Sequence, residues 1–274
     1  MGNIKWHKGF VSAMKLELIE NEQDLQYFDE HYIANRNQRI DLLVIKNEKS
    51  AIIYNPIGAS FSKYNICEYK SPSDSLTYGD FFKTLAYTGL YLNETHQGKL
   101  HNAGDYTMTF IREPHPNDLF ARLSEDGVII KNNSPGVYYL TNKLPFATQV
   151  IVTREIPENQ CTWLKCLTKH GTRQNLCNIL SKTPTLNADN KNDADVIMDI
   201  FTSANKEFVS KQMKEEPAMC KAVNELFADE IKEKDAIISN QQSQLANQQS
   251  QLAKKDALIA KLQAELEEYA GQTN

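Results

Sequence analysis

Residues 40–70 read IDLLVIKNEKSAIIYNPIGASFSKYNICEYK, and this stretch decides the fold. The apolar run at 40–46 predicts a buried strand, and the polar residues at 47–49 suit a hairpin turn. Residues 51–55 (AIIYN) predict a second strand, and residues 62–70 (SKYNICEYK) predict a third. We therefore expect three consecutive strands at this point of the chain.

Three charged residues stand out in these strands. Successive side chains of a strand face opposite sides, so Glu68 and Lys70 share one face while Cys67 and Tyr69 point to the other. Asp41 opens a neighbouring strand that is otherwise apolar. Two carboxylates buried close together are unfavourable unless a cation holds them, and their oxygens suit Mg²⁺ or Mn²⁺. An ammonium beside such an ion, here that of Lys70, can orient or activate a water or neutralise charge on a phosphate.

The order of these residues resembles the PD-(D/E)XK nuclease superfamily, in which an Asp opens one strand, Glu-x-Lys ends another, and a helix follows. Residues 39–46 (RIDLLVIK) and 65–87 (NICEYKSPSDSLTYGDFFKTLAY) are most similar to the bacterial branch of recombination-promoting, transposase-associated nucleases. The resemblance covers roughly the first two-thirds of the chain. Asp41 follows Arg39-Ile40 rather than Pro, which departs from the family's motif.

The resemblance implies an α/β, restriction-endonuclease-like fold with a mixed central sheet flanked by helices. It also implies an Mg²⁺- or Mn²⁺-dependent endonuclease that hydrolyses phosphodiester bonds in DNA and is linked to recombination or mobile elements. The metal would be held by the carboxylates of Asp41 and Glu68 and by the backbone carbonyl of Tyr69, and Lys70 would be the catalytic lysine. Glu17, on the expected first helix, is the candidate for a further carboxylate.

Two functions stay open at this stage, an active nuclease and a protein without catalytic activity. Glu-x-Lys is common on solvated strands, where it forms a weak exposed ion pair and nothing more. The chain would then be a catalytically inactive relative, an interaction protein that self-associates through its C-terminal segment. Retention of Lys70, which contributes little to folding, favours the enzyme. Plasmid cleavage with Mg²⁺ or Mn²⁺ would discriminate between the two.

Composition narrows the class of protein. The 274 residues include 30 Lys and Arg and 35 Asp and Glu, a formal net charge of −5, which argues against a protein-wide basic surface for nucleic acid. The five cysteines are an odd number without a disulfide-like framework. No apolar run approaches the length of a membrane span, and residues 1–20 lack a signal-peptide core. We expect a cytoplasmic protein with no membrane partner.

Helices are predicted on either side of the three strands. Residues 4–20 predict the first helix, residues 21–37 a polar connection, and residues 79–92 a second helix. Lys83 and Tyr87 of the second helix are the candidates for contact with DNA, although a helix packed through its aromatic residues with Lys83 exposed is the stronger interpretation for either residue alone. Further strands and a short helix follow, which completes a mixed α/β domain over residues 1–180. These further elements are expected at 105–113, 116–123, 126–131, 137–142 and 146–155.

The last part of the chain has a different pattern. Residues 181–195 are rich in Asn, Asp and Pro and predict a linker, residues 196–216 a helical segment, and residues 217–274 a long helix or coiled coil. Within 217–269 one apolar row is spaced by seven residues, which predicts a homo-oligomer, although the polar residues three positions on also allow a single solvated helix. The members of this row are Ile231, Ile238, Leu245, Leu252, Ile259 and Leu266.

Overall fold

The chain divides into two compact units, Met1–Glu215 and Glu216–Asn274. The computed structural model describes residues 4–33, 38–96, 102–216, 236–245, 247–249, 251–252 and 255. In this described part, no helix is long and apolar enough to cross a membrane.

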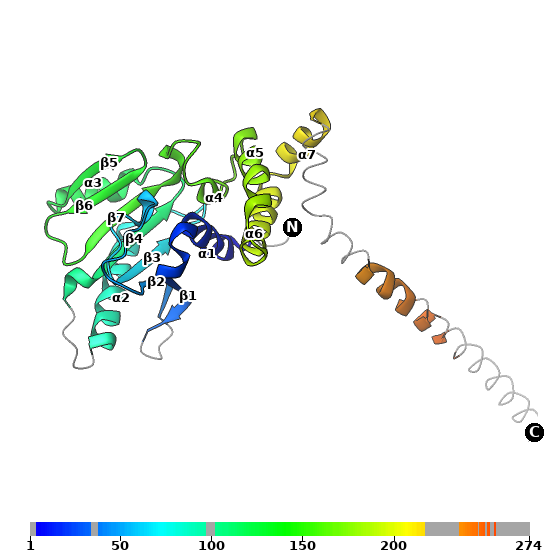
Figure 1. Ribbon diagram of the computed structural model, residues 1–274, viewed down its shortest axis with the longest axis horizontal. Helices are drawn as coiled ribbons and strands as arrows, with labels where there is room; N and C mark the ends of the chain where they lie inside the picture. The colour runs from blue at the N-terminus through cyan, green and yellow to red at the C-terminus, as the bar shows by residue number, and fades with distance from the viewer. Residues whose placement is uncertain are drawn as a thin grey trace, which may run out of the picture. The chain divides into compact units, whose positions relative to one another are not determined.

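A seven-stranded mixed sheet forms the centre of the first unit (Figure 1). Its strand order is β1-β2-β3-β4-β7-β6-β5. The three middle strands β3, β4 and β7 are parallel, while β1, β2 and β3 on one side and β7, β6 and β5 on the other are antiparallel. The strands are β1 Leu25–Tyr32, β2 Arg39–Lys46, β3 Tyr64–Tyr69, β4 Tyr106–Arg112, β5 Ile129–Ser134, β6 Val137–Thr141 and β7 Ala147–Val152.

Helices cover the sheet, which confirms the expected α/β class with a mixed central sheet. Helices α2 and α3 pack on the face that carries Ile66, Met108 and Phe110, in one apolar core with Phe81 and Leu119. Helix α1 packs against α4 and α6 (Figure 1). The α-helices are α1 Trp6–Glu17, α2 Tyr78–His96, α3 Asn117–Glu125, α4 Thr162–Lys165, α5 Arg173–Lys182, α6 Ala188–Ala204 and α7 Lys206–Glu215.

The side chains of β3 alternate as the sequence predicts. Ile66 belongs to the core beneath α2, and Glu68 contacts Lys83 of that helix. Tyr69 points to the opposite face, where its ring stacks on Phe10 of α1 with centroids 4.8 Å apart. The two faces of β3 therefore meet different helices, and the charged pair lies on the α2 face.

Two strand predictions are wrong. The segment expected to be a connection contains β1, an edge strand in which exposed and buried residues do not alternate cleanly, as edge strands allow. Residues 51–55 do not form a strand. Their backbone is paired instead by one side chain, because Asn21 donates to Ile52 O at 2.7 Å and accepts from Tyr54 N at 3.0 Å. The strands predicted at 40–46 and 62–70 are confirmed as β2 and β3, but the third strand of this part, β1, precedes them instead of lying between them.

The expected linker at 181–195 is instead mostly helical. Helix α5 extends to Lys182, and α6 starts at Ala188, where the side chain of Asn187 caps it by accepting from Asn190 N at 2.8 Å. Ser12 of α1 donates to Asp193 of α6 at 2.6 Å, so this segment packs on the domain. The Asn- and Asp-rich composition reflects a helix cap and solvated first turns, and the first unit extends to Glu215 rather than ending at residue 180.

The C-terminal unit is described only in part. Ile238, Leu245 and Leu252, three members of the row spaced by seven, lie on helical residues and are exposed in the single chain. The other three, Ile231, Ile259 and Leu266, lie outside the described residues. Self-association through 217–269 stays a prediction.

Candidate active site

The register of the sheet brings Asp41 and Glu68 together. β2 and β3 pair antiparallel with Leu42 opposite Cys67, so Asp41 and Glu68 come next in the register on neighbouring strands. A hydrogen bond from Tyr69 N to Asp41 Oδ2, 3.0 Å long, holds the ends of these strands together. The two carboxylates singled out in the sequence therefore belong to one place in the fold.

Two lysines reach Glu68 from different elements. Only 4% of the Glu68 side chain is exposed, and its Oε1 accepts from Lys83 Nζ of α2 at 2.7 Å and lies 3.0 Å from Lys70 Nζ. Lys70 also donates to Asp80 Oδ1 at 2.7 Å. We call Asp41, Glu68, Lys70, Asp80 and Lys83 the Glu68 cluster.

Asp80 is the member that sequence reasoning did not propose for the site. Its second oxygen, Oδ2, accepts from the backbone N–H of Thr77 at 2.9 Å and from the Thr77 hydroxyl at 2.6 Å, so it caps α2 and holds Lys70 at the same time. The available signal was the spacing of Asp80 and Lys83, which puts them one turn apart on one helix face.

The charged groups in this cluster shift one another's pKa values. Burial and the nearby charge of Glu68 raise the pKa of Asp41 above its usual range. Burial lowers the pKa of Lys70, but its hydrogen bond to Asp80 and the charge of Glu68 outweigh burial, so that this pKa lies above the ordinary value. Lys70 is therefore a charged ammonium at neutral pH. It can stabilise negative charge but cannot accept a proton from water.

The oxygen donors of the cluster fit a hard divalent cation. Burial is the larger cause of the raised pKa of Asp41, the nearby Glu68 carboxylate is the second, and a cation between the two carboxylates would offset their repulsion. Because the N–H and C=O of one strand residue point to the same neighbouring strand, the Tyr69 carbonyl faces the side of Asp41 as its N–H does. Among the described residues, no group of three or more His, Cys, Asp or Glu side chains could hold a metal. Mg²⁺ needs fewer, since it is bound by one or two carboxylates and completes its shell with waters and substrate phosphates.

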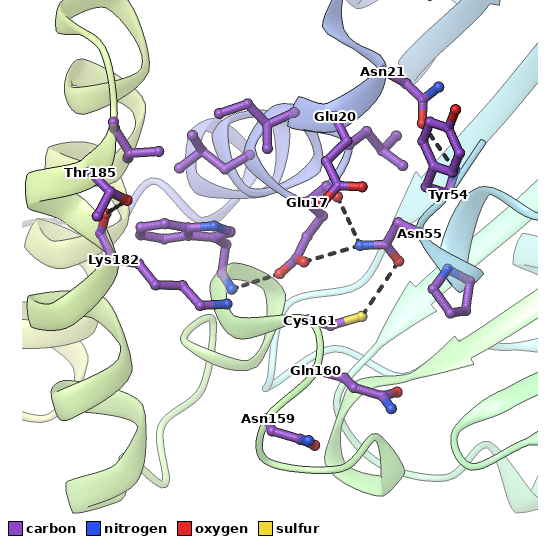
Figure 2. A pocket seen from close by; sticks show the side chains of 16 residues that line it. Glu17, Glu20, Asn21, Tyr54, Asn55, Asn159, Gln160, Cys161, Lys182 and Thr185 are labelled. Atoms are coloured by element: carbon purple, nitrogen blue, oxygen red, sulfur yellow. Dashed lines mark hydrogen bonds between the residues drawn. The ribbon is translucent and has the colours of Figure 1, made fainter. Parts of the chain in front are cut away.

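The structure does not bring Glu17, the tentative further metal ligand, into the Glu68 cluster. Its carboxylate accepts from the backbone N–H groups of Trp163 at 2.6 Å and Leu164 at 3.1 Å, at the start of α4. It lines a cavity of about 480 Å³, in which Glu17 and Asn55 point toward each other (Figure 2). Seven residues along a helix span about 10 Å, so Glu17 lies two turns away from Phe10, the α1 residue that packs over Tyr69.

The environment of Glu17 changes its acidity. Burial raises the pKa of this carboxyl from 4.5 to about 7, against the opposing effect of the two backbone hydrogen bonds. The residue is thus a helix cap that titrates near neutral pH.

The two candidates for DNA contact on α2 differ in their surroundings. Lys83 is 40% exposed and bridges Glu68 to solvent, so it could reach a phosphate. Tyr87 is partly buried against the apolar core, and its ring centroid lies 5.9 Å from Lys83 Nζ. The structure therefore brings Lys83 into the cluster and leaves Tyr87 beside it.

Comparisons with known proteins place this chain in no family. No family model matches it, and neither does a curated protein or a solved structure.

Proposed function

We propose that this protein is a divalent-metal-dependent endonuclease that hydrolyses phosphodiester bonds in DNA. The observation that carries the proposal is the convergence of Asp41 and Glu68 on adjacent strand ends, with the Lys70 ammonium 3.0 Å from Glu68 Oε1. Support also comes from the order of elements, since a strand bearing Asp41 precedes the Glu-x-Lys strand and α2 follows it. This is the arrangement that the resemblance to PD-(D/E)XK nucleases implies, and a restriction-endonuclease-like fold is part of the same proposal.

Each residue has a separate role in the proposed reaction. Asp41, Glu68 and the Tyr69 carbonyl would hold Mg²⁺ or Mn²⁺, which when bound activates a water and polarises the phosphate. Lys70, kept charged by Asp80, stabilises the negative charge that develops on the phosphate. Lys83 is exposed enough to contact a neighbouring phosphate of the strand.

The charge balance bears on how DNA would be held. The whole chain has a formal net charge of −5, so binding would depend on local lysines and arginines rather than on an overall basic surface. Dimerisation through 217–269 would bring two sites to one duplex and give one nick on each strand.

A reducing cytoplasm suits the four described cysteines, which are free thiols.

The proposal is tested by incubating the full-length protein with supercoiled plasmid and Mg²⁺ or Mn²⁺. We expect cleavage by the wild type and a loss of about 10²- to 10³-fold in Lys70→Ala, the usual cost of removing one preorganised electrostatic group. Lys131→Ala is the matched control, because Lys131 is exposed on β5 and belongs to no part of the cluster. Absence of cleavage by the wild type with both metals, or full activity of Lys70→Ala, would overturn the proposal.

A second candidate function follows from the same contacts. Lys70 and Lys83 already compensate Glu68, so the cluster is also complete as an ion-pair network. The protein would then be a catalytically inactive, self-associating interaction protein with a nuclease fold. The plasmid assay distinguishes this candidate, which requires that no variant cleaves.

A further inference from the structure

A separate cavity of about 670 Å³ lies at the end of β4. Its lining comes from residues 75–78 at the start of α2, from Arg112, from residues 115–119 at the start of α3, and from Ala121 and Arg122. We call it the Arg112 cavity. None of the five members of the Glu68 cluster lines it.

Arg112 is buried, and the described part of the chain provides it with no counter-charge. Arg112 is 9% exposed, and its Nε is buried without a hydrogen-bond partner among the described residues. Across the described ranges 4–33, 38–96 and 102–216, no hydrogen bond or ion pair of the Arg112 guanidinium is found, whereas Arg154 pairs with Glu113 at 3.2 Å and Arg39 with Glu30 at 2.9 Å. A buried cation without a partner is costly, which points to an anion that completes the site.

The start of α3 adds donors to the same cavity. This helix has nine residues, and its N-cap residue, Pro116, provides no side-chain hydrogen bond. The first N–H groups of a helix have no partner within the helix and attract anions, phosphate above all. Arg122 adds a second positive charge to the lining and Asp118 a negative one, so the wall remains cationic.

The Arg112 cavity adjoins the Glu68 cluster across two strands. The parallel register of β3 and β4 places Glu68 opposite Phe110, and Lys70 N donates to Ile111 O at 2.9 Å. By alternation, Lys70 and Arg112 follow on one face of neighbouring strands, which lie about 4.8 Å apart.

A hydrogen-bonded chain of three residues also connects the two sites. Asp80 bonds Lys70 with one oxygen and Thr77, a residue of the cavity wall, with the other. Because the two sites are neighbours, a nucleic-acid strand with one phosphate at Lys70 can place another phosphate at Arg112.

We propose that the Arg112 cavity is a phosphate-binding subsite for the nucleotide next to the one that is cleaved, an inference that rests on the proposed nuclease function. The guanidinium fork of Arg112 and the free N–H groups of α3 bind the phosphate oxygens. The volume is that of a pocket for a nucleotide-sized ligand rather than for a bare ion. Asp118 is the residue that limits the affinity.

The test measures binding of thymidine 5′-monophosphate to the full-length protein in EDTA, by isothermal titration calorimetry, with thymidine and inorganic phosphate as further probes. We expect Arg112→Met to weaken nucleotide binding by about 10- to 100-fold, the loss of a hydrogen bond to a charged group. Asp118→Asn should tighten binding by about two- to fivefold, since it removes a negative charge at a helix N-terminus. Arg173→Met is the matched control, because Arg173 opens helix α5 away from the cavity wall.

The outcomes separate this proposal from the nuclease. Nucleotide binding that is unchanged in Arg112→Met, or thymidine binding as tightly as its monophosphate, overturns the subsite. Inorganic phosphate binding as tightly as the nucleotide overturns the assignment to a nucleotide chain. Binding that depends on Arg112 in a protein that cuts no plasmid would instead reject the nuclease and retain a nucleotide site. If Arg112→Met does not fold, Arg112→Lys keeps the charge, loses the fork and should still weaken binding.

Discussion

Glu68 is buried and Glu17 is partly buried in the same domain, but different partners compensate the two carboxylates. Glu68 lies between the ammonium groups of two lysines, one on its own strand and one on α2. Glu17 accepts from two backbone N–H groups at the start of α4. Both were candidate metal ligands in the sequence, and Glu68 lies next to a second candidate carboxylate, that of Asp41 on the neighbouring strand.

The two carboxylates differ in whether their hydrogen-bond partners can be replaced by a metal ion. A lysine side chain has several rotatable bonds and can move aside when a divalent cation arrives, so Glu68 can pass from one positive partner to another. Backbone N–H groups cannot leave without unfolding α4, and they have no other acceptor among the described contacts. Mobile lysine partners therefore suit a carboxylate that binds a metal in catalysis, whereas fixed backbone partners suit one that stabilises the fold.

The largest expected effect concerns the metal. Glu68→Gln should lower plasmid cleavage by at least about 10²-fold, the scale for loss of an electrostatic group. It should also abolish stabilisation by Mn²⁺, which for a cation at 100 times its Kd raises the unfolding free energy by about 2.7 kcal/mol. Urea unfolding with and without Mn²⁺ measures this change. Glu17→Gln, the matched control, should keep both properties, and equal losses in the two variants would remove the distinction drawn above.

The next effect is a pH dependence specific to Glu17. Its pKa is raised to about 7 in the folded protein, so between pH 4.5 and 7 the folded state holds a proton that the unfolded chain has released. The unfolding free energy should therefore fall as pH rises through this window, by up to about 3 kcal/mol at 1.36 kcal/mol per pKa unit.

Glu17→Gln cannot titrate and should lack this component. Urea unfolding at pH 5 and pH 7.5, compared between the wild type and the variant, measures it. Asp41, whose pKa is also raised, adds a slope of the same sign that both proteins share. Identical slopes in the two proteins would show that Glu17 is ionised in the same way in the folded and unfolded states.

Removal of the whole side chain of Glu17 is a smaller change at neutral pH. In Glu17→Ala the N–H groups of Trp163 and Leu164 lose their acceptor, and both residues are buried. The variant should lose about 2 kcal/mol of unfolding free energy, within the range for orphaned buried donors. Its plasmid cleavage at 25 °C should equal that of the wild type. A loss of cleavage in a folded Glu17→Ala protein would return Glu17 to the active site.

Local patterns in the sequence predicted most of the sheet and the face of β3. The apolar run of β2 and the alternation in β3 are strong signals because each depends only on adjacent residues. β1 was missed because an edge strand need not alternate, and 51–55 was wrongly assigned because a single distant side chain, Asn21, replaces the strand partner. Both errors come from tertiary contacts that leave no local trace.

The candidate site was predictable from the sequence only where its residues are close together along the chain. The two-residue spacing of Glu68 and Lys70 placed them on one face, and the helical spacing of α2 put Asp80 and Lys83 near each other. Glu17 could not be placed in this way, since its partners lie 146 and 147 residues away along the chain. Arg112 was not recognised either, because an unpaired arginine is visible only once its neighbours are known.

The smallest expected effect sharpens the claim that Glu68 exchanges its partners. Lys83 is 40% exposed, so its ion pair with Glu68 is screened by solvent and contributes about 1 kcal/mol or less to stability. Lys83→Ala should therefore fold normally and cleave plasmid far better than Lys70→Ala.

Because Lys83 competes with the cation for Glu68, its removal should lower the Kd for Mn²⁺ by about twofold to fivefold, which corresponds to a coupling of up to about 1 kcal/mol. Titration of Mn²⁺ by isothermal calorimetry compares the variant with the wild type and with Lys131→Ala. Weaker Mn²⁺ binding in Lys83→Ala would mean that the lysine supports the ion rather than competing with it. Glu68 would then be held as rigidly as Glu17 is, and exchange of partners could not explain why only one of the two carboxylates suits catalysis.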